Sequence, residues 1–400
     1  MPGATPNHGG QGAAVHETGQ SLLAIIEQLA LPCRKFVAAS GRVANMGVEN
    51  NQESLAVMKR ICHMADSLTA TYLPEPEARE MKEADQPSSP VGDSVDKGKE
   101  QEATSLQAIA KEASTWHRAN CVKDIPDEKL LVGFHFKDAT SFDAGSQGRS
   151  RIKKILTQVT SLSADLPEGI FVRYGESRPD LLKILIVGPD DTPYEHGLFE
   201  FDMLCGKDFP RTPPSMYFQT TGGGVAHFNP NLYSNGTICL SLLGTWKGHP
   251  WEPDRSSILQ ILVSIQAMVF NSEPYYNEPG YEKNPNKTGA EAYNKRIEQL
   301  TIQYAVVDWL THRLKTPGVS APSPGGVAGP ANWKKSPIKC ANPSDDAVWG
   351  DVIRKHFELK GRMILETAQK WEKKQSDSQG MKYLVRDLRH QLKAHGFLNG

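Results

Sequence analysis

Cys239 is the residue of this 400-residue sequence with the clearest potential for covalent chemistry. It lies in the segment HFNPNLYSNGTICLSLL (227–243), after Asn-Pro-Asn and Ser-Asn-Gly, two turn-forming motifs that fix the direction of neighbouring side chains. A cysteine thiolate there can accept an acyl group, and Asn231 can supply an amide donor to the oxyanion that develops. Residue types alone favour the alternative, in which Cys239 is a small buried apolar residue.

The remaining cysteines and histidines do not extend this arrangement. The six cysteines contain no CxxC pair, which argues against a disulfide framework and a zinc site, so we expect no metal and no cofactor. His227 and His249 lie in the same region, but no His-plus-carboxylate pair of the protease type is evident. Free cysteines are typical of a reducing compartment, and we expect a cytoplasmic or nuclear location.

Charge and hydropathy argue against several classes of function. The formal net charge is −1, which gives no indication of nucleic-acid binding. No apolar run approaches the roughly 20 residues of a membrane span. The N-terminus has no basic segment followed by an apolar one, so a secreted protein is not expected either.

The elements around Cys239 predict an α+β domain. Apolar periodicity indicates a helix at 151–162, and runs of apolar residues indicate four strands after it. The strands are joined by short connections, which favour an antiparallel meander over parallel units. We expect them at 170–174, 181–188, 197–203 and 215–220.

The third predicted strand alternates, with Phe199, Phe201 and Met203 on one face and Glu200 and Asp202 on the other. An irregular stretch at 221–254 follows the last strand, and its length marks it as functional. Helices are predicted after it at 257–270 and 301–314.

The flanks of this domain are predicted to be partly helical and partly disordered. Amphipathic helices are expected at Ser21–Leu29 and Glu53–Leu68, and an isolated strand at 130–136. The basic C-terminal tail has helical periodicity; a solvated helix face is favoured there over binding to an acidic partner or to the chain's own acidic linker. The predicted divisions are an N-terminal extension (1–73), a disordered acidic linker (74–102), a pre-domain segment (103–149), the α+β domain (150–314), a Pro/Gly linker (315–331) and a basic helical extension (332–400).

Four motifs in this order resemble the ubiquitin-conjugating (UBC) domain over about residues 150–310, and in places to about residue 374. They are LLKILIVGPDDTPYEHGLFEFDM, DFPRTPPSMYF, FNPNLYSNGTICLSLL, and WEP followed by a helix that ends in EPYYNEPG. The details are most similar to the large members, those with a baculoviral repeat and the hybrid conjugating enzyme/ligase type. The resemblance implies the UBC fold: an N-terminal helix, a four-stranded meander, an active-site loop and C-terminal helices.

The resemblance also implies roles for particular residues. Family members accept ubiquitin from an activating enzyme as a thioester on a cysteine, matched by Cys239, and a substrate lysine then attacks that thioester. Asn231 matches the oxyanion donor of the His-Pro-Asn motif, with turn structure alone as its alternative role. Glu278 matches an acidic residue that orients the lysine, with a solvated loop charge as the alternative. The implied partners are ubiquitin, the activating enzyme, substrate lysines and a ubiquitin ligase.

Two departures from the family pattern concern the loop scaffold and the docking of partners. Asn229, before Pro230, replaces the histidine that braces the loop, and an amide can partly take over that role. The pair Pro210–Arg211 lacks the aromatic residue that many members use to dock ligases. Trp251 and Pro253 remain on the neighbouring loop as candidates for ligase or activating-enzyme docking.

Four alternatives stay open at this point. The chain could conjugate another ubiquitin-like modifier, or act as a conjugating enzyme and ligase together. A non-catalytic ubiquitin-binding scaffold is the reading from a different class, and the retained Cys239 argues against it. The last alternative, an inert Cys239 in a structural domain, is disfavoured by the joint motif match.

Overall fold

The computed structural model describes residues 97–139, 146–314 and 346–398, all within one compact unit that spans Asp93–Gly400. Several predicted segments lie outside the described residues. They are the helices at Ser21–Leu29 and Glu53–Leu68, the Pro/Gly linker at 315–331 and most of the acidic linker. The main elements are α3 (Lys97–Asn120), β1 (Val122–Ile125), α4 (Asp127–Leu130), α5 (Ser146–Asp165), β2 (Ile170–Gly175), β3 (Leu181–Val187), β4 (Leu198–Leu204), β5 (Ser215–Phe218), α6 (Ile258–Ser264), α7 (Lys287–Leu300), α8 (Asp308–His312), α9 (Gly350–Lys374) and α10 (Gln379–Ala394).

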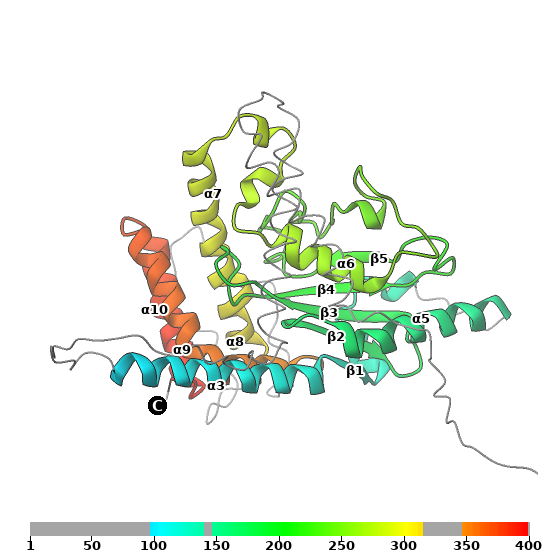
Figure 1. Cartoon of the computed structure of the whole chain (residues 1–400), viewed down its shortest axis with the longest axis horizontal. Coiled ribbons are helices and arrows are strands. Elements are labelled where there is room, and N and C mark those ends of the chain that lie inside the picture. The colour runs from blue at the N-terminus through cyan, green and yellow to red at the C-terminus, as the bar shows by residue number, and fades with distance from the viewer. Residues whose placement is uncertain (1–96, 140–145, 315–345, 399–400) are drawn as a thin grey trace, which may run out of the picture. The chain divides into compact units, whose positions relative to one another are not determined.

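The five strands lie side by side in sequence order, β1 to β5 (Figure 1). Strands β2 to β5 pair antiparallel with their neighbours, which confirms the predicted meander and the α+β fold class. The strand β1 was not predicted, and it pairs parallel to β2 from Val122 to Ile125.

The isolated strand predicted at 130–136 is wrong. Residue Leu130 ends the short helix α4, and turns and a 3-10 segment follow it. The apolar run LLVGFHF is explained instead by Leu130 and Phe134, which are buried beside Leu181 and Leu204. Their spacing of four residues suits a helical turn as well as a strand, so the pattern alone could not separate the two.

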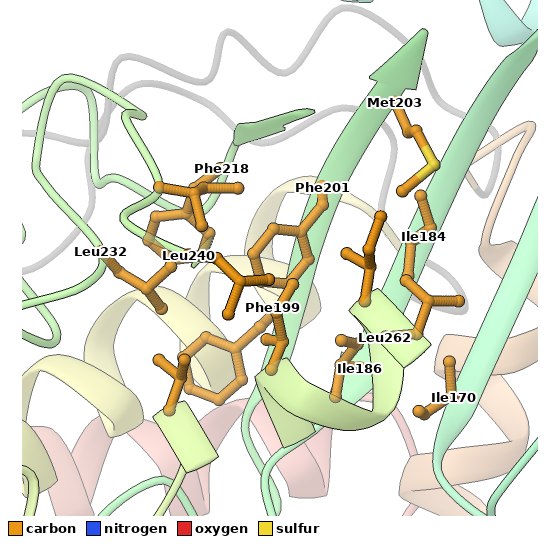
Figure 2. Close-up of a cluster of buried hydrophobic side chains, with 14 of the residues drawn as sticks. Ile170, Ile184, Ile186, Phe199, Phe201, Met203, Phe218, Leu232, Leu240 and Leu262 are labelled. Carbon is orange, nitrogen blue, oxygen red and sulfur yellow. The ribbon is translucent and has the colours of Figure 1, made fainter. Parts of the chain in front are cut away.

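One face of the sheet carries the main hydrophobic core. Helices α5 and α6 pack on this face, with Ile155, Val159 and Leu162 from α5 fully or almost fully buried. The irregular stretch contributes to the same core through Leu232, Ile238 and Leu240. Figure 2 shows Phe199, Phe201 and Met203 of β4 with Ile184 and Ile186 of β3 and with Leu232 and Leu240 of that stretch.

The opposite face of the sheet is covered by the C-terminal helices. Residues Phe171, Leu185 and Leu198 point to this side and share a second core with α9 and α10. We predicted a basic helical extension at 332–400 separate from the UBC domain; in the structure its helices share a core with the sheet. The residues that α9 and α10 bury in that core include Val352, Ile353, Phe357, Trp371, Leu384 and Leu388.

Charged side chains of β3 and β4 are buried between the sheet and these flanking segments. Glu200 and Asp202 are 3% and 0% exposed, and the Lys183 amine binds Asp202 at 2.8 Å and Glu200 at 3.3 Å. Arg313 binds Glu200 at 2.9 Å, and the Trp349 indole N–H donates to Glu200 at 3.0 Å. Burial alone would raise the pKa of Glu200, but Lys183 and Arg313 hold it low, so this carboxylate is ionised inside the protein.

The helices depart from the predicted bounds in four places. Helix α5 begins at Ser146 and ends at Asp165, so it extends beyond the predicted 151–162 at both ends. The predicted helix 257–270 is α6 continued by a π-helical segment, Ile265–Val269, and the helix predicted from 301 already begins at Lys287 with α7. Helix α3 begins at Lys97, so residues 97–102 of the predicted linker are helical. The segment KGKEQEA is rich in helix formers although it has little to bury, which is why composition indicated disorder.

No helix in the described part of the chain is both long and apolar enough to cross a bilayer.

Candidate active site

Cys239 lies in a short hairpin within the irregular stretch. Leu232 pairs with Ile238, and the Cys239 N–H donates to the Asn231 carbonyl at 2.9 Å. Successive side chains of an extended segment point to opposite faces. Because Leu232 and Ile238 are buried in the core, Asn231, Tyr233 and Cys239 belong to the other face of the hairpin.

The side chain of Asn231 is directed at the backbone of Cys239. Its Nδ2 atom donates to the Cys239 carbonyl at 2.9 Å, so the two residues are joined by both main-chain and side-chain hydrogen bonds. A carboxamide has two N–H donors, and this bond uses one of them. A second amide N–H of this kind can donate to an oxyanion. The cysteine is 8% exposed and its thiol is free.

Asn229 occupies the position of the family's histidine, and it is fully buried. Its Nδ2 atom donates to the Tyr194 hydroxyl at 2.9 Å and to the Val269 carbonyl at 2.8 Å. Its Oδ1 atom accepts the backbone N–H of Asn231 at 2.8 Å. The side chain therefore ties the start of the hairpin to the β3–β4 connection and to the end of the π-helical segment. Pro230, next to it, is half-buried.

Tyr233 was missed by the sequence analysis, although it shares a hairpin face with Cys239. A negative charge on the Cys239 sulfur raises the pKa of the Tyr233 phenol, and partial burial and the Glu278 carboxylate raise it further. The Tyr233 ring stacks on His227, with centroids 5.4 Å apart. The signal was available in the sequence, because the Ser-Asn-Gly turn places residues 233 and 237 opposite each other.

Glu278 follows a short 3-10 segment, Pro274–Asn277, and is exposed. Its charge acts on Tyr233, as that of Cys239 does, and also on His227 and Tyr293. Burial lowers the pKa of His227, whereas Glu278 raises it, and burial raises the pKa of Tyr293 to about 12 with a further contribution from Glu278. The structure thus places Glu278 in the neighbourhood of Tyr233, and so of Cys239.

The segment after Cys239, residues 244–254, is bonded to the residues on either side of that cysteine. The Thr245 hydroxyl donates to the Ile238 carbonyl at 2.6 Å and accepts the Leu240 N–H at 2.9 Å. Thr245 was not singled out from the sequence, and it holds the backbone around Cys239 in its irregular path. Trp246, the next residue, is 45% exposed beside the active-site segment.

The four residues named for partner docking fall into two groups. The Trp251 indole N–H donates to the Pro210 carbonyl at 2.7 Å, and the Trp251 ring is 8% exposed, so it acts mainly as a link between two loops. Arg211 and Pro253 are exposed, and Arg211 forms a surface ion pair with Asp208. A partner at this surface would contact Pro210, Arg211 and Pro253 with little of Trp251.

Among the described residues, one trio brings three metal-ligating groups within 4.8 Å of one another, namely Asp190, Glu195 and His196. Glu195 already accepts from the Thr367 hydroxyl and lies 3.3 Å from the His196 ring. Burial and then the charge of Lys360 lower the pKa of His196, and a cation there would be repelled by the same lysine. We assign no metal to it.

Comparison with known proteins identifies the class of this fold and site. Residues 153–301 match the family model described as ubiquitin-conjugating enzyme. The chain is 35% identical over 263 residues to the human protein named dual E2 ubiquitin-conjugating enzyme/E3 ubiquitin-protein ligase BIRC6, a match that covers 62% of this chain and 5% of that protein.

Other similar proteins carry related names. One is probable ubiquitin-conjugating enzyme protein 17 of Caenorhabditis elegans, 39% identical over 256 residues, or 61% of this chain and 31% of that protein. Another is probable ubiquitin-conjugating enzyme E2 25 of Arabidopsis thaliana, 46% identical over 153 residues, or 38% of this chain and 25% of that protein. The chain spans less than a third of the length of each of these relatives.

The chain contains a domain of the ubiquitin-conjugating enzyme family, and this domain holds the Cys239 hairpin. Within that family it is related to BIRC6 and other large members, as the sequence motifs indicated.

Proposed function

We propose that this chain accepts ubiquitin as a thioester on Cys239 and passes it to lysine side chains of substrates. The observation that carries the proposal is the hairpin face shared by Cys239 and Asn231, where an amide donor is held 2.9 Å from the Cys239 carbonyl. A free cysteine in that setting suits acyl transfer, and the family match supports ubiquitin as the acyl group.

Loading is an exchange of one thioester for another. The thiolate of Cys239 attacks the carbonyl carbon at the ubiquitin C-terminus, and the cysteine of the activating enzyme leaves as a thiolate. The thioester of the activating enzyme is formed with ATP, so this chain itself needs no cofactor for the step. The proposed contacts for the activating enzyme or a ligase are the exposed residues Arg211 and Pro253 and the half-buried Pro210.

Transfer to substrate is an aminolysis. An uncharged lysine amine attacks the thioester carbon, the oxyanion receives a hydrogen bond from Asn231, and the Cys239 thiolate leaves as the isopeptide bond forms. The amine must lose a proton before or during attack, and the Glu278 carboxylate is the proposed group that orients it and favours that loss. Tyr233, on the same hairpin face, is proposed to line the path of the lysine.

We propose further that the chain conjugates without a separate ligase, as a combined conjugating enzyme and ligase. The similarity to BIRC6, whose name states both activities, supports this, and so does the missing aromatic residue at Arg211. A reducing location, cytoplasm or nucleus, is proposed from the free thiols of Cys121, Cys205 and Cys239.

A loading assay tests the proposal. The purified chain is incubated with activating enzyme, ATP and ubiquitin, and the products are compared with and without reductant. A reductant-labile adduct supports a thioester, and its absence rejects the proposal. Repeating the assay with other ubiquitin-like modifiers tests the choice of modifier, and lysine conjugates formed without added ligase support the combined activity.

A further inference from the structure

Four asparagine side chains connect Cys239 to the loop at residues 270–286, which carries Glu278 and is called the Glu278 loop below. The Asn271 Nδ2 donates to the Asn277 Oδ1 at 2.8 Å, and the Asn277 Nδ2 donates to the Asn229 Oδ1 at 3.2 Å. The same Asn229 oxygen accepts the Asn231 N–H, and the Asn231 side chain donates to the Cys239 carbonyl. The series runs from the residue just before Glu278 to the reactive cysteine without a break.

Asn229 is the centre of this series, and its hydrogen-bonding capacity is completely used. The carboxamide has two N–H donors and two acceptor lone pairs. The donors are directed to the Tyr194 hydroxyl and the Val269 carbonyl, and the acceptor takes N–H groups from Asn231 and Asn277. All of this takes place at a fully buried site, where an unmade hydrogen bond is costly.

A neutral histidine could not make the same four bonds, because its ring has one donor and one acceptor. In this chain the asparagine at 229 therefore does more than substitute for the family's histidine. Its oxygen accepts hydrogen bonds from both the Cys239 hairpin and the Glu278 loop, and so fixes the position of the hairpin relative to the loop. The donor from the Glu278 loop is Asn277, and Asn271 orients Asn277 by donating to its oxygen.

We propose that Asn277 is a positioning residue that holds the Glu278 loop in register with Asn231 through the shared oxygen of Asn229. The inference rests on the proposed function, since it concerns the geometry of lysine transfer at Cys239. Asn277 touches neither ubiquitin nor the lysine in this account. Its Nδ2 atom also donates to the Met268 carbonyl at 3.4 Å, but its link to the Cys239 hairpin is the shorter bond to Asn229, at 3.2 Å. Loading of ubiquitin on Cys239 needs the cysteine but not the Glu278 loop. A change at Asn277 should therefore slow the transfer to lysine and leave loading unchanged.

The test uses Asn277→Ala and Asn277→Asp in the full chain. Both variants lose the donor to Asn229, and the aspartate keeps the size and the acceptor for Asn271. We expect each to load ubiquitin at the wild-type rate and to discharge it to free lysine roughly ten- to a hundred-fold more slowly, the range expected for a small misplacement of reacting groups. Asn229→His is expected to slow discharge similarly, because it cannot accept both N–H groups.

The matched control is Asn294→Ala. Asn294 anchors the same loop by donating to the Ser272 carbonyl at 2.8 Å, a bond that does not involve Asn229. Discharge by this variant should stay within about two-fold of wild type if the bond from Asn277 to Asn229 is what matters. An equal loss in Asn294→Ala and Asn277→Ala would overturn the proposal in favour of general anchoring of the loop.

A double-mutant cycle with Asn231→Ala separates positioning from a merely structural role. If Asn277 acts through Asn229 on Asn231, adding Asn277→Ala to Asn231→Ala should slow discharge much less than it does in the wild type. Multiplicative losses would refute the coupling, and so would unchanged discharge by Asn277→Ala. A wild-type chain that forms no thioester at all would instead defeat the proposed function, which the loading step reports separately.

Discussion

Replacing Asn231 with alanine separates the catalytic role of its amide from its role in the hairpin. The substitution removes the Nδ2 donor to the Cys239 carbonyl, and with it the second N–H that we assign to the oxyanion. The main-chain bond from the Cys239 N–H to the Asn231 carbonyl survives. The hairpin should therefore still form, held also by Leu232 and Ile238 in the core.

Two magnitudes follow from this geometry. Loss of one partly buried hydrogen bond costs about 0.5–1.5 kcal/mol of stability. Loss of an oxyanion donor costs roughly 10²–10³ in rate, about 2.7–4 kcal/mol of transition-state stabilisation. A change of about 1 kcal/mol lowers Tm by only about 2–4 °C in a domain of this size class. The rate of ubiquitin transfer to lysine should therefore fall far more than the fraction of folded protein does.

The assay is single-turnover discharge of preformed thioester to free lysine, with loading measured in parallel. The matched control is Asn235→Ala, which removes a 3.0 Å bond from the Thr237 N–H in the same hairpin and leaves the Cys239 contacts intact. We expect slow discharge and near-normal loading for Asn231→Ala, and near-normal values of both for Asn235→Ala. Discharge slowed less than about three-fold would refute the oxyanion role, and equal loss of loading and discharge would indicate misfolding.

Three further predictions concern the loop charge, the buried ion pairs and a buried histidine. Glu278→Ala should slow discharge to lysine at neutral pH without changing loading; unchanged discharge would reduce Glu278 to a solvated loop charge. Lys183→Met leaves Glu200 and Asp202 buried without the amine that they bind, and should lower the free energy of unfolding in urea by about 3–5 kcal/mol. The control Arg211→Met removes an exposed ion pair and should lower it by at most about 1 kcal/mol. Burial, and then the charge of Lys360, lower the pKa of His196 from 6.5 to about 4. Between pH 6.5 and pH 4 the unfolded chain therefore binds more protons at this residue than the folded chain does, and the free energy of unfolding falls as the pH drops through this range. This histidine should contribute about 2 kcal/mol to the loss between pH 7 and pH 5; His196→Asn, which tolerates the left-handed backbone at φ 64°, should reduce that loss, and an unchanged pH profile would exclude His196 as its source.

The meander and the helix before it were predictable because their signals are local. Strand periodicity, short connections and turn motifs each depend on a few neighbouring residues, and β2 to β5 were placed within about two residues. The hairpin with Cys239 and Asn231 was predictable for the same reason, since two turn motifs fix it.

The covering of the second sheet face could not be predicted from the same patterns. Alternation of Phe199 and Phe201 with Glu200 and Asp202 is typical of a sheet with one solvated face. Both carboxylates are buried, because Lys183, Arg313 and Trp349 pair with them from elements far apart in the sequence. The alternation of residues within one strand cannot predict ion pairs and hydrogen bonds with residues far away in the sequence.

The asparagine series was also hidden from the sequence, for a related reason. Asn277 and Asn229 lie 48 positions apart, and an asparagine in a turn is ordinarily explained by turn chemistry alone. Their contact depends on how the Glu278 loop packs against the π-helical segment, where Asn271 and Asn277 both donate to the Met268 carbonyl. The departure from histidine at 229 was visible, but its four hydrogen bonds were not.

The most direct test of the account is the intact mass of the chain after loading with activating enzyme, ATP and ubiquitin. We predict an added mass of one ubiquitin per chain, removed by reductant, absent in Cys239→Ala and retained in Cys205→Ala. Cys205 is a suitable control because it is fully buried and free, and burial raises the pKa of its thiol. An adduct that persists in Cys239→Ala, or none in the wild-type chain, would contradict the assignment of Cys239 as the thioester residue.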